Sequence, residues 1–113
     1  MKASKSIRTN KEFDLVYKKG KVFFGTFFAL RVLVVKDAKD FRVGIVVSNK
    51  ILPKAVERNK KKRQLREIIR LNQGRLISGV WISLVLKKGS EDSNYQELEK
   101  EFLLLAKKAG IIR

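Results

Sequence analysis

The segment from Lys54 to Leu71 constrains the fold most, because it must form a helix that can bury only part of its length. It contains neither Gly nor Pro, and Pro53 and Gly74 stand close to its two ends, so the sequence predicts one long helix. Apolar residues gather on one side, but cations share that side in the first half: Ala55, Leu65, Ile68 and Ile69 against Arg58, Lys61 and Lys62. Only the second half can therefore bury a full apolar face.

The basic charge of the chain is concentrated in this region. The 113 residues include 27 Lys and Arg against 11 Asp and Glu, a net charge of +16. Residues 50–70 hold nine of the basic side chains and two of the acidic ones, a net charge of +7. A solubilising surface mixes both signs, whereas a surface of one sign indicates a polyanionic partner. We therefore expect nucleic-acid binding.

One stripe of this helix carries hydrogen-bond donors that all face the same way. At about 100° per residue, four positions fall within roughly 60° of one another: Asn59, Arg63, Arg66 and Arg70. The planar guanidinium group suits both phosphates and base edges. The stripe is thus the first candidate for contact with a nucleic acid.

The chain lacks the side chains that most enzymes use for chemistry. It has no His and no Cys, which removes the commonest general base, the thiolate nucleophile and the usual zinc ligands. Its carboxylates are scattered or gathered between Glu91 and Glu101, away from the basic surface, which argues against a self-contained metal-dependent nuclease. We assign no catalytic residue and no metal ligand, and we expect no small-molecule substrate.

No membrane association is expected. The N-terminus lacks the apolar core of a secretory signal, and no stretch approaches the roughly 20 apolar residues of a membrane span. The basic helix also lacks the Trp- or Phe-rich face of an interfacial helix. We expect a cytoplasmic protein.

The N-terminal half predicts a helix followed by strands. Thr9 to Glu12 has the form of a capping box, and the helix should run from Asn10 to Lys19. The apolar stretch 22–35, interrupted at Gly25, should pair with residues 41–47 as a hairpin across a turn at 37–40.

The C-terminal half predicts a strand and a closing helix. Residues 80–86 read as a largely buried strand, with Trp81 in the core. Ser93 and Gln96 form a second possible capping box, and the following helix should end at Gly110. The order α-β-β-β-α-β-α describes a single α+β domain over residues 1–113, with a mixed sheet of about four strands covered by three helices. The basic helix forms a β-α-β crossover within it.

The basic helix resembles the signature of the bacterial ribonuclease P protein family, the Arg-Asn-Arg motif. Arg58 and Asn59 match its first two letters, Lys60 replaces the third Arg, and the basic residues that follow also match: Lys62, Arg63 and Arg66. The likeness extends over almost the whole chain, through Phe13, Tyr17, Gly20, Val43, Gly44 and the turn from Ser48 to Lys50.

This resemblance implies a function and a set of contacts. The protein would be the accessory subunit of ribonuclease P, which removes the 5′ leader of precursor tRNA, while a large RNA holds magnesium ions and performs the hydrolysis. The motif helix and the preceding turn would bind that RNA through Lys50, Lys54, Arg58, Asn59, Lys60, Lys62, Arg63, Arg66 and Arg70. No cofactor is expected on the protein alone. The resemblance also implies a left-handed crossover, against the general right-handed preference.

The leader would lie in a cleft between the first helix and the sheet. By the resemblance, Phe13 and Tyr17 line it from the helix, and Ala29 and Arg31 line it from the sheet. An aromatic pair at helical spacing is also common in protein cores, so the core interpretation stays open. A ribosomal or ribosome-assembly rRNA-binding protein is the alternative function, because it would share the charge and the small size.

Overall fold

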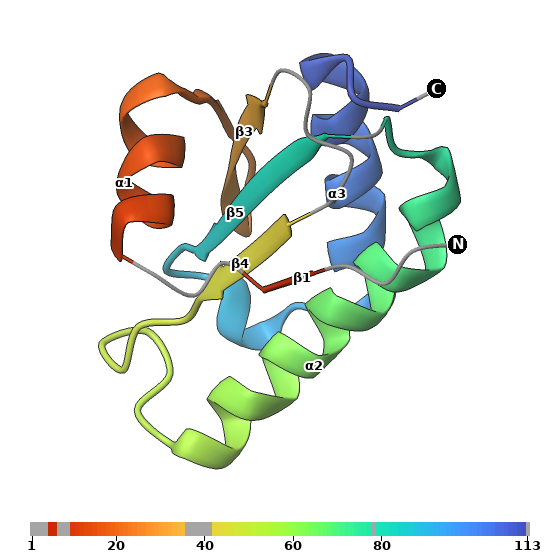
Figure 1. The fold of residues 1–113 in the computed structure, drawn as a ribbon. Coiled ribbons are helices and arrows are strands. Elements are labelled where there is room, and N and C mark those ends of the chain that lie inside the picture. The colour runs from red at the N-terminus through yellow and green to blue at the C-terminus, as the bar shows by residue number, and fades with distance from the viewer. Residues whose placement is uncertain (1–4, 7–9, 36–41, 78, 113) are drawn as a thin grey trace.

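The computed structural model describes residues 5–6, 10–35, 42–77 and 79–112, and it shows an α+β fold (Figure 1). The strands are β1 (Lys5–Ser6), β2 (Lys21–Phe24), β3 (Phe28–Val34), β4 (Arg42–Val46) and β5 (Val80–Leu86). The α-helices are α1 (Asn10–Lys19), α2 (Ala55–Asn72) and α3 (Tyr95–Ala109), with short 3-10 turns at Gln73–Arg75 and Ser90–Asp92. The predicted class and long basic helix are confirmed, and so is the predicted element order from α1 onward; the two-residue strand β1 before α1 was not predicted.

The strands form one mixed sheet in the order β1-β4-β5-β3-β2. Strand β5 lies in the centre, antiparallel to β3 and parallel to β4, and α2 connects the two parallel strands. Four strands make up the body of the sheet, and the two-residue β1 pairs in parallel with β4 at its edge.

The predicted hairpin between 22–35 and 41–47 is wrong, because β5 lies between β3 and β4. The hairpin that does form joins β2 to β3 around Gly25, which the sequence marked only as an interruption. The predicted turn at 37–40 lies outside the described residues. Strand β5 takes the central position because its sequence is largely apolar, and a strand with a neighbour on each side is better buried than one at the edge of the sheet.

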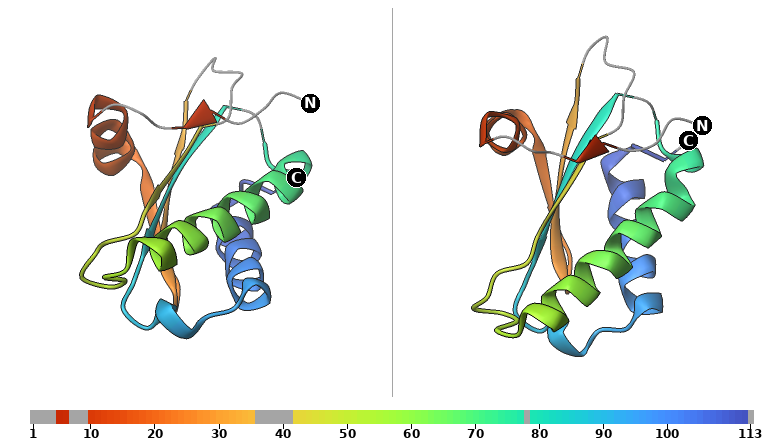
Figure 2. Two further views of the ribbon diagram at one scale, coloured as in Figure 1. Left: turned by 90° about the horizontal axis from the view of Figure 1, so that it is seen from below. Right: turned by 60° about the horizontal axis from the view of Figure 1, so that its bottom comes forward.

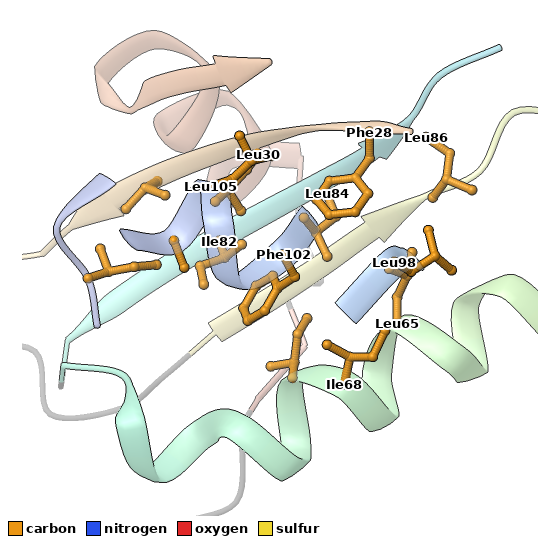
Figure 3. Close-up of a cluster of buried hydrophobic side chains, with 14 of the residues drawn as sticks. Phe28, Leu30, Leu65, Ile68, Ile82, Leu84, Leu86, Leu98, Phe102 and Leu105 are labelled. Carbon is orange, nitrogen blue, oxygen red and sulfur yellow. The ribbon is translucent and has the colours of Figure 1, made fainter. Parts of the chain in front are cut away.

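The helices cover the two faces of the sheet unequally. Helices α2 and α3 lie on one face and α1 on the other, as Figure 2 shows with the sheet seen nearly edge-on. The core fills the space between the sheet and the α2–α3 layer (Figure 3). Its largest buried side chains include Phe28, Leu30, Leu65, Ile68, Ile82, Leu84, Leu98 and Phe102. Burial of such side chains is the main source of stability in a domain of this size.

Alternation along the strands decides which side chains reach this core. In β5, Val80, Ile82, Leu84 and Leu86 point into it, whereas Trp81 faces the α1 side and is only half-buried. The prediction of Trp81 as a core residue is therefore wrong. The guanidinium carbon of Arg42, its partner on β4, lies 4.5 Å from the centre of the Trp81 ring.

Helix α3 begins one residue later than its predicted capping box. Asn94 is the N-cap, its side chain accepts from the backbone N–H of Glu97, and the Glu97 carboxylate accepts from the N–H of Asn94 in return. The Ser93 hydroxyl instead donates to the carbonyl of Ser90. Gly110 ends the helix at φ 74°, in the left-handed region that glycine adopts without strain.

Candidate nucleic-acid interface

The predicted stripe on α2 is present and open to solvent. Asn59, Arg63, Arg66 and Arg70 are all exposed, while Leu65, Ile68 and Ile69 on the other side are buried. Ala55, expected on the apolar side, is exposed because the first turns of α2 extend past the core. The helix therefore presents a cationic surface over its first half and a cationic edge over its second half.

Arg70 differs from the rest of the stripe because it is paired. Its Nη2 and Nε donate to Glu67 at 2.6 and 3.0 Å. This hydrogen bond lowers the pKa of the Glu67 carboxyl, and it raises that of Arg70. Arg63 and Arg66 have no ion pair among the residues described. These two guanidinium groups are thus available to an external anion.

Arg58 has a role inside the fold that the sequence did not reveal. Its Nη1 donates to the carbonyls of Leu52 and Pro53, at 2.8 and 2.7 Å, and thereby ties the start of α2 to the chain leading into it. N-cap Lys54 provides no side-chain cap. Arg58, the first residue of the motif, thus holds the start of α2 in place. Its Nη1 is used inside the fold, so only the rest of the guanidinium group can serve an external partner.

Lys61, one of the cations that the sequence places on the apolar side of α2 in its first half, is buried. Its Nζ donates to the carbonyl of Ser93 and, at 3.1 Å, to the Ser93 hydroxyl. Burial lowers the pKa of this amine, and the neighbouring charge of Lys60 lowers it further, while Asp92, Glu97 and Glu91 oppose the shift. The bond joins the cationic half of α2 to the entry of α3.

The other predicted contacts of the motif helix lie on its solvent side or in the preceding turn. Lys50, Lys54 and Lys60 are exposed, and Lys62 is partly buried. The backbone N–H of Lys50 donates to the Ser48 hydroxyl at 3.1 Å, which closes the turn before α2. The predicted set thus surrounds α2 on most of its accessible surface.

On the opposite face of the sheet, Tyr17 and Arg31 come together. Tyr17 is 63% exposed, and the guanidinium carbon of Arg31 lies 4.3 Å from the centre of its ring. Val16, one residue earlier, is fully buried and anchors α1. Gly20 then allows the chain to turn tightly, because a Cβ there would lie 2.4 Å from the carbonyl oxygen of Val16. The Tyr17 ring is therefore a surface feature, as the resemblance implied.

The other two predicted cleft residues contribute differently. Ala29 faces the same side of β3 as Arg31 but is only 8% exposed, so it offers little contact area. The side chain of Phe13 lies outside the described residues, and its assignment stays a prediction.

Phe24 is a surface aromatic that the sequence analysis missed. It is 70% exposed, and its register with Ala29 places it on the same side of the sheet as Arg31. The Lys87 amine lies 6.0 Å from the centre of the Phe24 ring and donates to the carbonyl of Gly25. Strand alternation between Phe23 and Phe24 could have indicated this position, once the turn at Gly25 was assigned.

Glu101 of α3 holds the β2–β3 turn in place. Its carboxylate accepts from three successive backbone N–H groups, those of Thr26, Phe27 and Phe28, at 2.6, 2.8 and 3.1 Å. The approach is close enough that a Cβ at Gly25 would lie 2.5 Å from the Glu101 carboxyl carbon. The turn that presents Phe24 is thus fixed from the far side of the sheet.

Other kinds of site find no support in the part of the chain that the structure describes. It has no cluster of three or more acidic, His or Cys side chains that could hold a metal ion. Within the same ranges, no helix is long and apolar enough to cross a membrane.

Comparison with known proteins identifies a consistent set of relatives. A family model described as Ribonuclease P matches residues 1–110. The ribonuclease P protein component of Finegoldia magna is 39% identical over 110 residues, covering 97% of this chain and 95% of its own. That of Streptococcus agalactiae is 37% identical over 112 residues, covering 99% and 100%.

Solved structures agree in fold. The ribonuclease P protein of Staphylococcus aureus superimposes with a TM-score of 0.88 at 26% identity, covering 98% of this chain and 100% of that one. That of Thermotoga maritima gives a TM-score of 0.79 at 30% identity, covering 91% and 96%. These matches favour the ribonuclease P interpretation over a ribosomal one.

Proposed function

This chain belongs to the ribonuclease P protein family, the protein component of a tRNA-processing ribonuclease, and we propose that it binds two RNAs at once in the cytoplasm. The exposed stripe of α2 contacts the RNA subunit of ribonuclease P. The α1 side of the sheet contacts the 5′ leader of precursor tRNA. The two surfaces lie on opposite faces of one sheet, so both contacts can form together (Figure 2).

The observation that carries the first contact is the exposed pair Arg63 and Arg66. Neither has an ion pair among the described residues, and like charges near them on α2 destabilise the free protein slightly. RNA phosphates would remove that repulsion and accept charge-assisted hydrogen bonds. Arg70 can join them, because its partner Glu67 is exposed and can be displaced.

The second contact rests on the chemistry of the α1 side of the sheet. Tyr17 and Phe24 are exposed rings, and Arg31 and Lys87 lie beside them. Aromatic platforms next to cations bind single strands with little regard to sequence, because every base has a flat face. This suits leaders of varied sequence.

Hydrolysis in this proposal belongs to the RNA subunit. The protein has no His and no Cys, and the described residues include no cluster of ligands for a metal ion. Magnesium ions held by RNA would supply the activated water and stabilise the leaving group. The protein increases the affinity for precursor tRNA, positions its 5′ leader and neutralises part of the negative charge of the phosphates.

Reconstitution tests the proposal. The protein alone should leave precursor tRNA intact, and together with the RNA subunit at low magnesium it should stimulate cleavage strongly. Cleavage by rigorously RNA-free protein would contradict the division of labour. Failure to stimulate any ribonuclease P RNA, including that of the same organism, would contradict the role as its subunit.

A further inference from the structure

A pocket beside the motif helix includes two residues, Gln64 and Tyr95, that have no role in the contacts described so far. It lies where the middle of α2 meets the first turn of α3, and its volume is about 340 Å³. Lys60, Arg63, Gln64 and Glu67 line it from α2, and Tyr95 lines it from α3. It is thus next to the predicted RNA surface, on the side turned toward α3.

The pocket combines an aromatic side chain, that of Tyr95, with polar groups that lack partners. The Gln64 Oε1 and the Tyr95 hydroxyl are both buried, and neither has a hydrogen-bond partner in the described structure. Buried polar atoms are nearly always paired, so two unpaired atoms on one pocket point to a ligand that supplies the missing bonds. Glu67 adds further acceptor capacity at the same wall.

The charges around the pocket select the class of ligand. Lys60 and Arg63 are exposed cations on its lining, and they would attract phosphates on either side of an inserted group. Burial raises the pKa of the Tyr95 hydroxyl, which therefore stays protonated and can donate a hydrogen bond. A neutral, flat group with donors and acceptors on its edge, attached to a phosphate chain, fits this arrangement.

We propose that the pocket receives one unstacked nucleobase of the RNA bound by α2, with the Tyr95 ring as its stacking wall and the Gln64 amide against its edge. The inference rests on the proposed function and deepens it, because it adds a base contact to a surface otherwise suited to phosphates. Sequence-specific recognition of RNA generally uses such splayed bases, held on aromatic rings and hydrogen-bonded at their edges. The pocket would therefore fix the register of the RNA on the helix.

Variants of the pocket and of the stripe separate the two kinds of contact. Tyr95→Leu removes the ring and should weaken binding to ribonuclease P RNA about tenfold, with the salt dependence unchanged because no phosphate contact is lost. Gln64→Leu should also weaken binding, without disturbing the ring. Arg66→Ala, outside the pocket, should weaken binding and flatten the salt dependence. Leu104→Ala, an exposed apolar position on the side of α3 opposite Tyr95, is the control and should bind like the parent.

Chemical probing of the RNA gives a readout that does not depend on affinity. With saturating, folded protein, one base should be protected at its Watson–Crick edge by the parent and by Leu104→Ala. The same base should become reactive with Tyr95→Leu and with Gln64→Leu. Thermal melts identify any variant that fails to fold, and Gln64→Leu then carries the test alone.

The outcomes distinguish the pocket from the wider proposal. Weaker binding by Arg66→Ala, with unchanged affinity and footprint in both pocket variants, overturns the pocket and leaves the RNA-binding stripe intact. Parent-like binding by all the variants overturns both. Equal flattening of the salt dependence by Tyr95→Leu and Arg66→Ala would mean that phosphates are bound in the pocket, which also overturns base recognition.

Discussion

The guanidinium carbon of Arg31 lies 4.3 Å above the centre of the Tyr17 ring, which joins α1 to the central part of the sheet through an exposed cation–π contact. Such a contact contributes only about 0.5–1 kcal/mol at an exposed site. The pair is therefore better suited to present a ring and a charge to a ligand than to stabilise the fold.

Tyr17→Ala tests that interpretation. A buried aromatic residue would cost about 3–5 kcal/mol on truncation, but a ring that is 63% exposed should cost about 1 kcal/mol. The holoenzyme should lose about 1–3 kcal/mol of affinity for precursor tRNA and bind mature tRNA as before. Binding of leader-bearing and leaderless substrates, with melts of the free protein, checks this. An equal loss for both substrates would contradict the leader contact, and Phe13→Ala can be judged by the same comparison.

Arg63→Ala and Arg66→Ala should separate binding from stability. Each should weaken RNA binding by about 1–3 kcal/mol, with little change in the thermal transition. The slope of the logarithm of the binding constant against the logarithm of the salt concentration should fall by about one, as expected for the loss of one phosphate contact. Arg58→Ala should instead destabilise the fold by about 1–2 kcal/mol, because the bonds to Leu52 and Pro53 are lost. Salt titrations and melts of all three variants measure the contrast. Unfolding by Arg63→Ala or Arg66→Ala would show that the stripe is structural.

Lys61→Met should reveal a pH-dependent cost of burying an amine. The variant lacks the hydrogen bonds from Lys61 to Ser93, which should cost about 1–3 kcal/mol of stability. The folded-state pKa of Lys61 is below its ordinary 10.5, so the unfolded chain binds the proton more tightly. Stability of the parent should therefore rise as the pH increases from the lowered pKa toward 10.5, and the variant should lack this rise. Urea unfolding of both proteins at neutral and alkaline pH measures the difference between their free energies of unfolding. This difference should grow as the pH rises. A difference that does not change with pH would contradict a lowered pKa of Lys61.

Glu101→Gln should loosen the β2–β3 turn. Hydrogen bonds to a charged acceptor contribute about 1.5–3 kcal/mol, and the amide can replace only part of the acceptor capacity for Thr26, Phe27 and Phe28. Glu57→Gln, exposed on α2, removes the same charge without these bonds and is the control. Chemical denaturation should show a loss for Glu101→Gln alone, and amide exchange at residues 26–28 should accelerate. Equal losses in the two variants would indicate a general charge effect.

Local patterns in the sequence predicted most of the helices and the central strand. The long helix was predicted to within about one residue because it lacks Gly and Pro and is bounded by them, and β5 because its apolar run is continuous. Strand pairing was not predicted, since β3 and β4 are neighbours in sequence but β5 is inserted between them. The hand of the crossover likewise follows from no local pattern in the chain.

The candidate site was predicted where exposure follows from periodicity and missed where it depends on distant partners. The stripe from Asn59 to Arg70 needs only helical spacing, and the structure shows it exposed. Lys61 is buried because Ser93, 32 residues away, supplies its acceptors, and Arg58 is engaged by the turn before α2. The pocket at Tyr95 depends on how α2 and α3 pack, which one-dimensional spacing does not contain.

The carboxylate of Glu101 has a consequence for where a polyanion can bind. Three successive backbone N–H groups that converge on one point form a natural seat for a phosphate. In this protein the chain fills that seat with its own side chain, from α3. A phosphate that approaches the β2–β3 turn therefore finds these three N–H groups already bonded to Glu101 and has no anion site there. A nucleic acid must then bind through exposed cations, such as the arginines of α2.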